Sequence, residues 1–396
     1  MVKNLSRDNI LWLVSWYPSA VSSFDGDFIQ RHAKAASILH NITVIFVKKD
    51  SEGLVTKNKK TVINKSGNLS ETIIYYYSPK TGISIVDRII SRMKHNRICK
   101  AALKKHLADN GLPALVHVHV ALHVAPIALW LHKKYGLALL VSEHWTGYLK
   151  NAKPNIENYH PVYKKWIQQL FNKAYAITTV SKVLCDAIRE TFDIPTCHVI
   201  PNVVDTSIFF PVVKSKSSST RFIHVSLLNY QKNPAEIIEA FSMVKKAGYD
   251  FTLSVYGPAP GDLLQLVRAR GLEKEISFLD EVPQKVLAED MQQSDALVLY
   301  SRYETFGCVV IEANACGLPA ILSDLPVFRE YIVENKTGIF AKPCDPQSLA
   351  ETIIRFMKDK DHFIKEEIAS HTKNTFGFDV IAKQFDDLYK AVVIKP

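Results

Sequence analysis

The chain has 396 residues, of which 47% are hydrophobic and 22% charged, enough for two α/β domains that each bury a sizeable core. No stretch is apolar over the roughly 18 residues that a membrane-spanning helix needs. The best candidate, 121–141, contains two histidines and two lysines. The first residues are polar and the apolar run after them is too short for a signal peptide, so we expect a cytoplasmic protein.

The formal net charge of +10 is unevenly distributed. Residues 1–213 carry 27 basic and 14 acidic side chains, whereas residues 214–396 carry 22 and 25. A local focus lies at 83–106, where arginines and lysines alternate with isoleucines at helical spacing. Most such helices bury an apolar stripe, but this clustering also suits docking on an anionic membrane. Nucleic acid is not an expected partner, because aromatics are not interleaved with the cluster and no recognised nucleic-acid module is present.

Strand-like apolar runs alternate with helical periods along the chain. The first series predicts strands at 10–14, 42–47, 115–120, 138–142, 176–180 and 198–200. The segment KSKSSST at 214–220 reads as a linker. The second series predicts strands at 222–226, 251–256, 276–278, 296–300 and 320–322. This order predicts two doubly wound, Rossmann-like domains with parallel sheets, 1–213 and 221–379, and a ligand site in the cleft between them.

The six cysteines are scattered without a CxxC pair, and most lie in apolar helix or strand contexts. We therefore expect reduced core thiols rather than disulfides or a zinc site. No set of histidines, cysteines and carboxylates has metal-ligand spacing, and no serine nucleophile elbow or GxGxxG fingerprint is present.

The most informative segment is 301–320, SRYETFGCVVIEANACGLPA. Glu304 and Glu312 enclose a turn at Gly307 that opens an apolar helix. The N-terminus of such a helix presents unpaired amides that suit a phosphate. Carboxylates beside it can accept hydrogen bonds from sugar hydroxyls. The ordinary alternative is that Glu304 caps the helix and Glu312 is a solvated helix residue.

The segment resembles the signature of the retaining glycosyltransferases of family 4, in which two glutamates separated by seven residues enclose a glycine turn before an A-x-G-x-P helix end. The resemblance continues downstream through Glu330, Gly338, Asp345 and Leu349. It implies the GT-B fold and is closest to the bacterial surface-polysaccharide type. The corresponding last helix of the family crosses back onto the first domain, which implies the same for 380–396.

The resemblance assigns roles to the residues of this segment. Glu312 is expected to bind the ribose of a nucleotide sugar, and Glu304 the hydroxyls of the donor sugar. Amides near Phe306, Gly307 and Cys308 complete the expected donor pocket.

Lys232 follows the predicted strand 222–226 and stands just before a helix. In the family a Gly-Arg pair precedes this lysine, and both basic groups contact the donor diphosphate. Here Ser226 and Leu227 occupy the Gly and Arg positions. We keep Lys232 as a diphosphate ligand, assign no arginine, and note that an isolated lysine is more often a solvated surface residue.

Gly26 precedes the first predicted helix, so its backbone could approach a phosphate closely, as in the family, or form an ordinary turn. Asp25 and Asp27 around it spell a D-x-D, the metal-binding pair of another glycosyltransferase fold. That pair normally follows a strand deep in a single domain, so we discount it in this first loop.

His144 stands at the carboxyl end of the predicted strand 138–142, within an E-H-W-T-G run that resembles family members with a histidine near the donor sugar. It is the expected catalytic-centre residue of the first domain, with a structural role as the alternative. His119 ends another strand and is a weaker candidate for acceptor contact.

Together these features imply a retaining hexosyltransferase that moves a sugar from a UDP- or GDP-linked donor to a glycan or polyprenyl-diphosphate-linked acceptor in cell-surface polysaccharide synthesis. The resemblance implies no cofactor and no metal, and the basic half suggests peripheral contact with the inner face of the cell membrane. Two alternatives stay open: a nucleotide-sugar epimerase, which would convert donor without acceptor, and a non-catalytic sugar-binding protein, which would bind without transfer.

Overall fold

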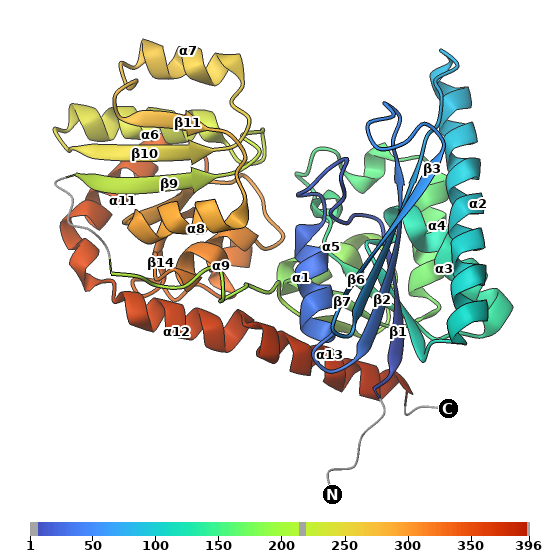
Figure 1. Ribbon diagram of the computed structural model, residues 1–396. Helices are drawn as coiled ribbons and strands as arrows, with labels where there is room; N and C mark the ends of the chain where they lie inside the picture. Colours follow the sequence, from blue (N-terminus) through green and yellow to red (C-terminus); the bar gives the residue numbers. More distant parts are fainter. Residues whose placement is uncertain (1–6, 214–218, 394–396) are drawn as a thin grey trace, which may run out of the picture.

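The computed structural model describes residues 7–213 and 219–393, which build two sheets flanked by helices (Figure 1). The first sheet has the order β3-β4-β2-β1-β5-β6-β7-β8, and the second β11-β10-β9-β12-β13-β14. In each, the strand order reverses beside the first strand of the domain, β1 or β9. This reversal creates a crevice outside the carboxyl ends of the strands, where doubly wound folds bind ligands.

The first sheet and its helices occupy the N-terminal half. Its strands are β1 Asn9–Val14, β2 Asn41–Lys49, β3 Lys59–Ser66, β4 Leu69–Tyr76, β5 Leu115–His119, β6 Leu139–Glu143, β7 Ala174–Thr179 and β8 Cys197–Val199. Its helices are α1 Asp27–Ala36, α2 Ser84–Asn110, α3 Ala121–Tyr135, α4 Pro161–Phe171 and α5 Lys182–Thr191. The central strands β5 and β6 are buried at every residue, as expected for strands with helices on both faces.

The second sheet follows in the C-terminal half. Its strands are β9 Thr220–Val225, β10 Phe251–Tyr256, β11 Ile276–Leu279, β12 Ala296–Leu299, β13 Ala320–Ser323 and β14 Gly338–Ala341. The helices are α6 Pro234–Lys246, α7 Gly261–Ala269, α8 Gln284–Gln293, α9 Cys308–Ala315, α10 Pro326–Arg329, α11 Pro346–Asp359, α12 Lys365–Phe376 and α13 Phe378–Val393.

All eleven strands expected from the sequence are confirmed to within two residues at either end. Three strands were missed. The hairpin β3–β4 pairs antiparallel at the edge of the first sheet, so the expectation of a purely parallel sheet is wrong there. β3 carries mostly exposed residues and therefore lacks the apolar run that marks the other strands. β14 is an edge strand of the second sheet and has only four residues.

The expected linker 214–220 lies mostly outside the described residues, and Thr220 already opens β9. The domain bounds that we drew around it stay a prediction. The expectation of six reduced thiols is wrong for Cys185 in α5 and Cys197 in β8, which form a disulfide with a Cα–Cα distance of 6.5 Å. Neither the 12-residue spacing nor the composition around these cysteines signals the pairing.

The C-terminal helices connect the two halves. In Figure 1, α12 lies below the second sheet and α13 continues below the first. α13 packs against α1. Its Tyr389 hydroxyl lies 2.8 Å from Nδ1 of His117 in β5, and its Phe385 ring lies 5.9 Å from that of Trp12 in β1. Among residues 7–213 and 219–393, no helix is both long and apolar enough to span a bilayer.

Candidate active site in the interdomain cleft

A cavity of about 390 Å³ lies between the two sheets at the carboxyl ends of their strands. Phe24 of the loop after β1 and Asp27 and Phe28 of the first turn of α1 line it on one side, and the loop after β9 contributes Ser226, Leu227 and Lys232. The start of α9 contributes Gly307, Cys308 and Glu312. Two hollows of about 600 Å³ lie elsewhere, but none of the predicted site residues lines them. The structure therefore brings four of the predicted residues, Lys232, Gly307, Cys308 and Glu312, to one cavity.

The turn between β12 and α9 positions the helix start. Gly307 has φ of 86°, and a Cβ there would lie 3.0 Å from Cε1 of Phe328, so this position favours glycine on two grounds. Phe306 is 2% exposed and stacks on Tyr331 with ring centroids 4.8 Å apart. Its side chain thus anchors the turn, and only its backbone remains available to a ligand. The first amides of α9 have no partner within the helix, which makes its N-terminus a site for negative charge.

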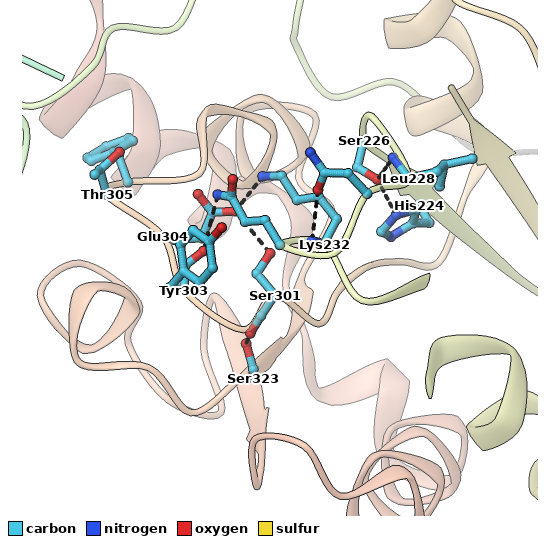
Figure 2. A network of polar contacts seen from close by, with 12 residues as sticks. His224, Ser226, Leu228, Lys232, Ser301, Tyr303, Glu304, Thr305 and Ser323 are labelled. Atoms are coloured by element: carbon cyan, nitrogen blue, oxygen red, sulfur yellow. Dashed lines mark hydrogen bonds and ion pairs between the residues drawn. The ribbon is translucent and has the colours of Figure 1, made fainter. Parts of the chain in front are cut away.

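Glu304 sits in a polar network just before this turn. Figure 2 shows Lys232 and Ser301 converging on its carboxylate: the Lys232 ammonium pairs with Oε1, and the Ser301 hydroxyl donates to the same oxygen at 2.9 Å. The backbone carbonyl of Ser301 accepts a hydrogen bond from Ser323 at 2.7 Å, which ties the network to β13. Glu304 is 5% exposed, so the alternative of a simple surface cap does not describe it.

Glu312 contacts the other domain directly. Nη1 of Arg31 in α1 lies 2.6 Å from its Oε1, and Nη2 of the same guanidinium lies 3.1 Å from Asp27. Arg31 is 4% exposed and Glu312 is 7% exposed, so this is a buried ion pair rather than a solvated helix residue. Sequence reasoning missed Arg31, because 281 residues separate the partners and nothing beside Arg31 marks it as special.

Burial dominates the electrostatics at this point. It raises the pKa of Glu312, and the Arg31 guanidinium counteracts the rise. Burial also raises the pKa of the Cys308 thiol to about 12. Cys308 is therefore a neutral thiol near pH 7, and its contribution to the cavity is its backbone amide and its shape.

Ser226 and Leu227, where the sequence departs from the family, lie in a loop with its own hydrogen bonds. The Ser226 hydroxyl lies 2.7 Å from Nε2 of His224 and accepts from the amide of Leu228 at 3.0 Å (Figure 2). Nδ1 of His224 faces the carbonyl of Val298 at 2.8 Å, which holds this loop against β12. Leu227 lines the cavity with its side chain 62% exposed. An apolar group therefore faces the cavity where the family places an arginine.

Gly26 caps α1 with φ of 73°, and a Cβ there would lie 2.6 Å from the carbonyl carbon of Trp16. This backbone packing accounts for the glycine, which is buried and does not itself line the cavity. The neighbouring carboxylates are both paired: Asp25 with Lys48 at 2.9 Å, and Asp27 with Arg31.

His144 directly follows β6 and is 6% exposed. The hydroxyl of Thr305, the residue after Glu304, donates to the backbone carbonyl of His144 at 3.2 Å across the domain interface. This contact joins the backbone of His144 to the segment that carries Glu304, but neither His144 nor Glu304 lines the cavity. His119 is fully buried behind it, with ring centroids 5.7 Å apart, and does not line the cavity. Its acceptor contact stays a prediction.

Further contacts hold the two walls together. The carboxylate of Glu330 accepts from the amides of Lys182 and Val183 at 2.7 and 2.8 Å, and so caps α5 from the other domain. The Tyr303 hydroxyl accepts from the amide of Lys153 at 3.0 Å. These contacts join the two domains through residues outside the cavity lining.

Two family models match consecutive parts of the chain. Residues 74–208 match the model described as Glycosyltransferase Family 4, and residues 205–374 match Glycosyl transferases group 1. The chain belongs to the glycosyltransferases of family 4. This assignment favours sugar transfer over the epimerase and the non-catalytic alternatives.

This glycosyltransferase is 25% identical to N-acetyl-alpha-D-glucosaminyl L-malate synthase of Bacillus anthracis over 297 residues, which cover 70% of the chain and 75% of the relative. Its fold is similar to that of sucrose-phosphate synthase from Thermosynechococcus elongatus, with a TM-score of 0.78 at 17% identity over 97% and 98% of the two chains. It is also similar to HepE of Anabaena, solved in complex with UDP and glucose, with a TM-score of 0.71 at 17% identity over 97% and 100%. These similarities confirm the predicted GT-B fold.

Proposed function

We propose that this glycosyltransferase transfers a hexose, with retention of anomeric configuration, from a UDP- or GDP-linked donor bound in the interdomain cavity to a glycan or polyprenyl-diphosphate-linked acceptor. The observation that carries the donor site is the cavity lined by Lys232, Glu312 and the start of α9, with Glu304 paired to Lys232 beside it. The UDP and glucose in the HepE complex support a nucleotide sugar as ligand of this fold.

Breaking the bond between a sugar and a diphosphate places negative charge on the leaving oxygens, and catalysis requires groups that stabilise that charge. Lys232 and the first amides of α9 supply fixed positive charge from two sides of the cavity. An ammonium has three N–H donors, so its pairing with Glu304 leaves donors for phosphate oxygens. On this account the diphosphate needs neither the missing family arginine nor a metal ion.

Glu312 is the proposed ribose ligand. Arg31 engages Oε1, which leaves Oε2 to accept a hydrogen bond from a ribose hydroxyl. Arg31 also keeps this buried carboxyl closer to ionisation by opposing the rise of its pKa. Arg31 therefore acts as a positioning residue that prepares Glu312 from the opposite domain.

Glu304 is the proposed ligand of the donor-sugar hydroxyls, and His144, directly after β6 in the N-terminal domain, is the proposed second residue at the sugar. Their segments are joined by the hydrogen bond from Thr305 to His144. Burial lowers the pKa of His144 well below its ordinary value, so a neutral imidazole is offered to the sugar.

We also propose that the enzyme acts at an anionic membrane surface, the inner face of the cell membrane. The first turns of α2 expose six large apolar side chains between 39% and 68%: Ile83, Ile85, Val86, Ile89, Ile90 and Met93. The buried residues of α2 are Cys99, Leu103 and Leu107, all in its second half. Exposed apolar groups among lysines and arginines match a surface with both acyl chains and anionic headgroups. A membrane-bound acceptor fits synthesis of cell-surface polysaccharide.

A thermal-shift panel of UDP- and GDP-sugars tests the donor class, because a ligand that binds only the folded state raises Tm. We expect one nucleotide series to raise Tm and its sugar-free diphosphate to do so too. No shift with any member at millimolar concentration would contradict the donor proposal. For the positive donor, NMR of the initial product reports whether the anomeric configuration is retained.

Flotation with anionic liposomes tests the membrane proposal independently. Wild-type protein should float at low salt and be released at high salt. The triple variant Ile85→Ser, Ile89→Ser, Met93→Ser should remain at the bottom, whereas the exposed substitution Leu264→Ser in α7 should not change flotation. Equal behaviour of the two variants would overturn this proposal.

A further inference from the structure

Three histidines from separate segments converge behind the N-terminal wall of the cleft. They are His32 in α1, His119 at the end of β5, and His144 directly after β6. One ring nitrogen of each lies within 4.8 Å of those of the other two. Their exposures are 1%, 0% and 6%, so all three are nine-tenths buried or more. Sequence spacing gave no metal-ligand set, because the chain brings these residues together from positions far apart.

The ring nitrogens of this cluster lack ordinary partners. Within the described residues, both nitrogens of His119, both nitrogens of His144 and Nδ1 of His32 have no hydrogen-bond partner. A neutral imidazole carries one N–H donor and one lone pair, and a buried polar group without a partner costs about 1–3 kcal/mol. Three such rings side by side therefore point to a ligand that satisfies them.

His117 provides the contrast within the same strand. It is equally buried, yet its Nδ1 lies 2.8 Å from the Tyr389 hydroxyl and its Nε2 lies 2.7 Å from the Ser142 hydroxyl. The fold therefore provides hydrogen-bond partners for both ring nitrogens of His117, the β5 histidine that packs in the core. Its neighbour two residues on, His119, stacks on Trp12 with centroids 3.8 Å apart and leaves both nitrogens unpaired.

His32 has the orientation of a metal ligand. Its Nε2 lies 2.9 Å from the carbonyl oxygen of Pro201, which can only accept, so Nε2 carries the hydrogen and Nδ1 presents its lone pair. Metal-ligating histidines typically donate their other N–H to a carbonyl or carboxylate in this way.

We propose that His32, His119 and His144 form a binding site for a divalent transition-metal ion, with zinc as the best-suited member. Neutral imidazoles suit zinc, whereas magnesium and calcium prefer oxygen ligands. Zn–N bonds are about 2.0–2.1 Å long, which puts tetrahedral ligand atoms roughly 3.3 Å apart, so nitrogens now within 4.8 Å of one another would move closer to share one ion. Three protein ligands leave a fourth tetrahedral position for water.

This site is distinct from the diphosphate site. The diphosphate is assigned to Lys232 and α9 on the C-terminal wall, whereas the three histidines belong to the N-terminal domain. The two proposals share His144, but zinc binding is measured without donor or acceptor, so either proposal can fail without the other.

Titration of the tag-free, chelator-treated full chain with ZnCl₂ by isothermal calorimetry tests the site, with CoCl₂ absorption as a second readout. We expect one zinc per chain and the visible bands of tetrahedral cobalt. Loss of a group that only hydrogen-bonds to a metal ligand typically lowers metal affinity about 10–100-fold. His32→Asn and His144→Asn each remove a ligand itself, so each should weaken zinc binding by about 100-fold or more. His198→Asn, at an exposed histidine of β8, should leave it unchanged.

Circular dichroism and thermal melting confirm that each variant is folded before titration. Should one variant not fold, the other and the wild-type cobalt spectrum still decide the question. The proposal is overturned if the wild-type chain binds no zinc at 1:1 stoichiometry, or if both cluster variants bind as tightly as His198→Asn.

Discussion

The two walls of the cleft carry opposite kinds of polar side chain. On the C-terminal wall the acids Glu304 and Glu312 are each paired with a cation, Lys232 and Arg31. Behind the N-terminal wall His119 and His144 are buried, and burial lowers the pKa of each; within residues 7–213 and 219–393 their ring nitrogens have no hydrogen-bond partner. The difference indicates that the C-terminal wall recognises the nucleotide diphosphate through charged groups, whereas the N-terminal domain offers uncharged contacts. Arg31 is the exception, because it belongs to the N-terminal domain but pairs with Glu312 on the C-terminal wall.

The largest loss of turnover is expected for Lys232→Ala. Removal of one group that stabilises transition-state charge typically lowers kcat by 10²–10³-fold, and the Leu227 position offers no second cation, so we expect a loss of about 100-fold or more. Steady-state kinetics with the identified donor measures it. Lys246→Ala, at an exposed lysine of α6, should change kcat little, and equal effects of the two substitutions would remove Lys232 from the site.

Arg31→Gln should have a smaller effect that acts through Glu312. Without the guanidinium the pKa of Glu312 rises further, so its carboxyl is protonated over more of the acidic range and binds ribose less well. We expect the KM for donor to rise about tenfold, and the acidic limb of the kcat/KM profile to move to higher pH. Arg31→Lys should restore part of both effects. A uniform loss of kcat without a shift of the pH profile would point to a merely structural Arg31.

The contrast between these two residues also shows what the sequence could and could not predict. Lys232, Glu304 and Glu312 stand beside strand ends and helix starts that the apolar pattern locates, and the resemblance to family 4 singles them out there. Arg31 contacts Glu312 only because two domains meet, and no local pattern encodes that meeting. The His32, His119 and His144 cluster was missed because it joins three segments of one domain that lie far apart in the sequence. The hairpin β3–β4 was missed because its exposed edge strand lacks an apolar run.

Of these substitutions, Glu143→Gln should change turnover least. Its main effect should be on the pH dependence of stability. Burial raises the pKa of Glu143 to about 7, from 4.5, although the Ala121 amide and the Tyr148 hydroxyl donate to it at 2.9 Å. The folded state thus binds the proton more tightly than the unfolded state. Stability from this group is fully present below about pH 4.5 and is lost as the pH rises through 7, by about 3 kcal/mol in total.

Glutamine keeps the accepting oxygen without titrating, so the variant should lack this fall in the free energy of unfolding. Urea unfolding at pH 5 and pH 8 measures it. The gap between Glu143→Gln and wild type should widen with pH, and a constant gap would contradict the raised pKa.

The central claim is that Glu312 holds the ribose of an activated sugar in the cleft, and donor binding measures it most directly. Calorimetric titration with the donor identified by thermal shift should give a Kd that rises about 10–100-fold in Glu312→Ala, because a hydrogen bond to a charged group contributes about 1.5–3 kcal/mol. Glu351→Ala, at an exposed glutamate of α11, should bind like wild type. An unchanged Kd in a folded Glu312→Ala variant would contradict the account.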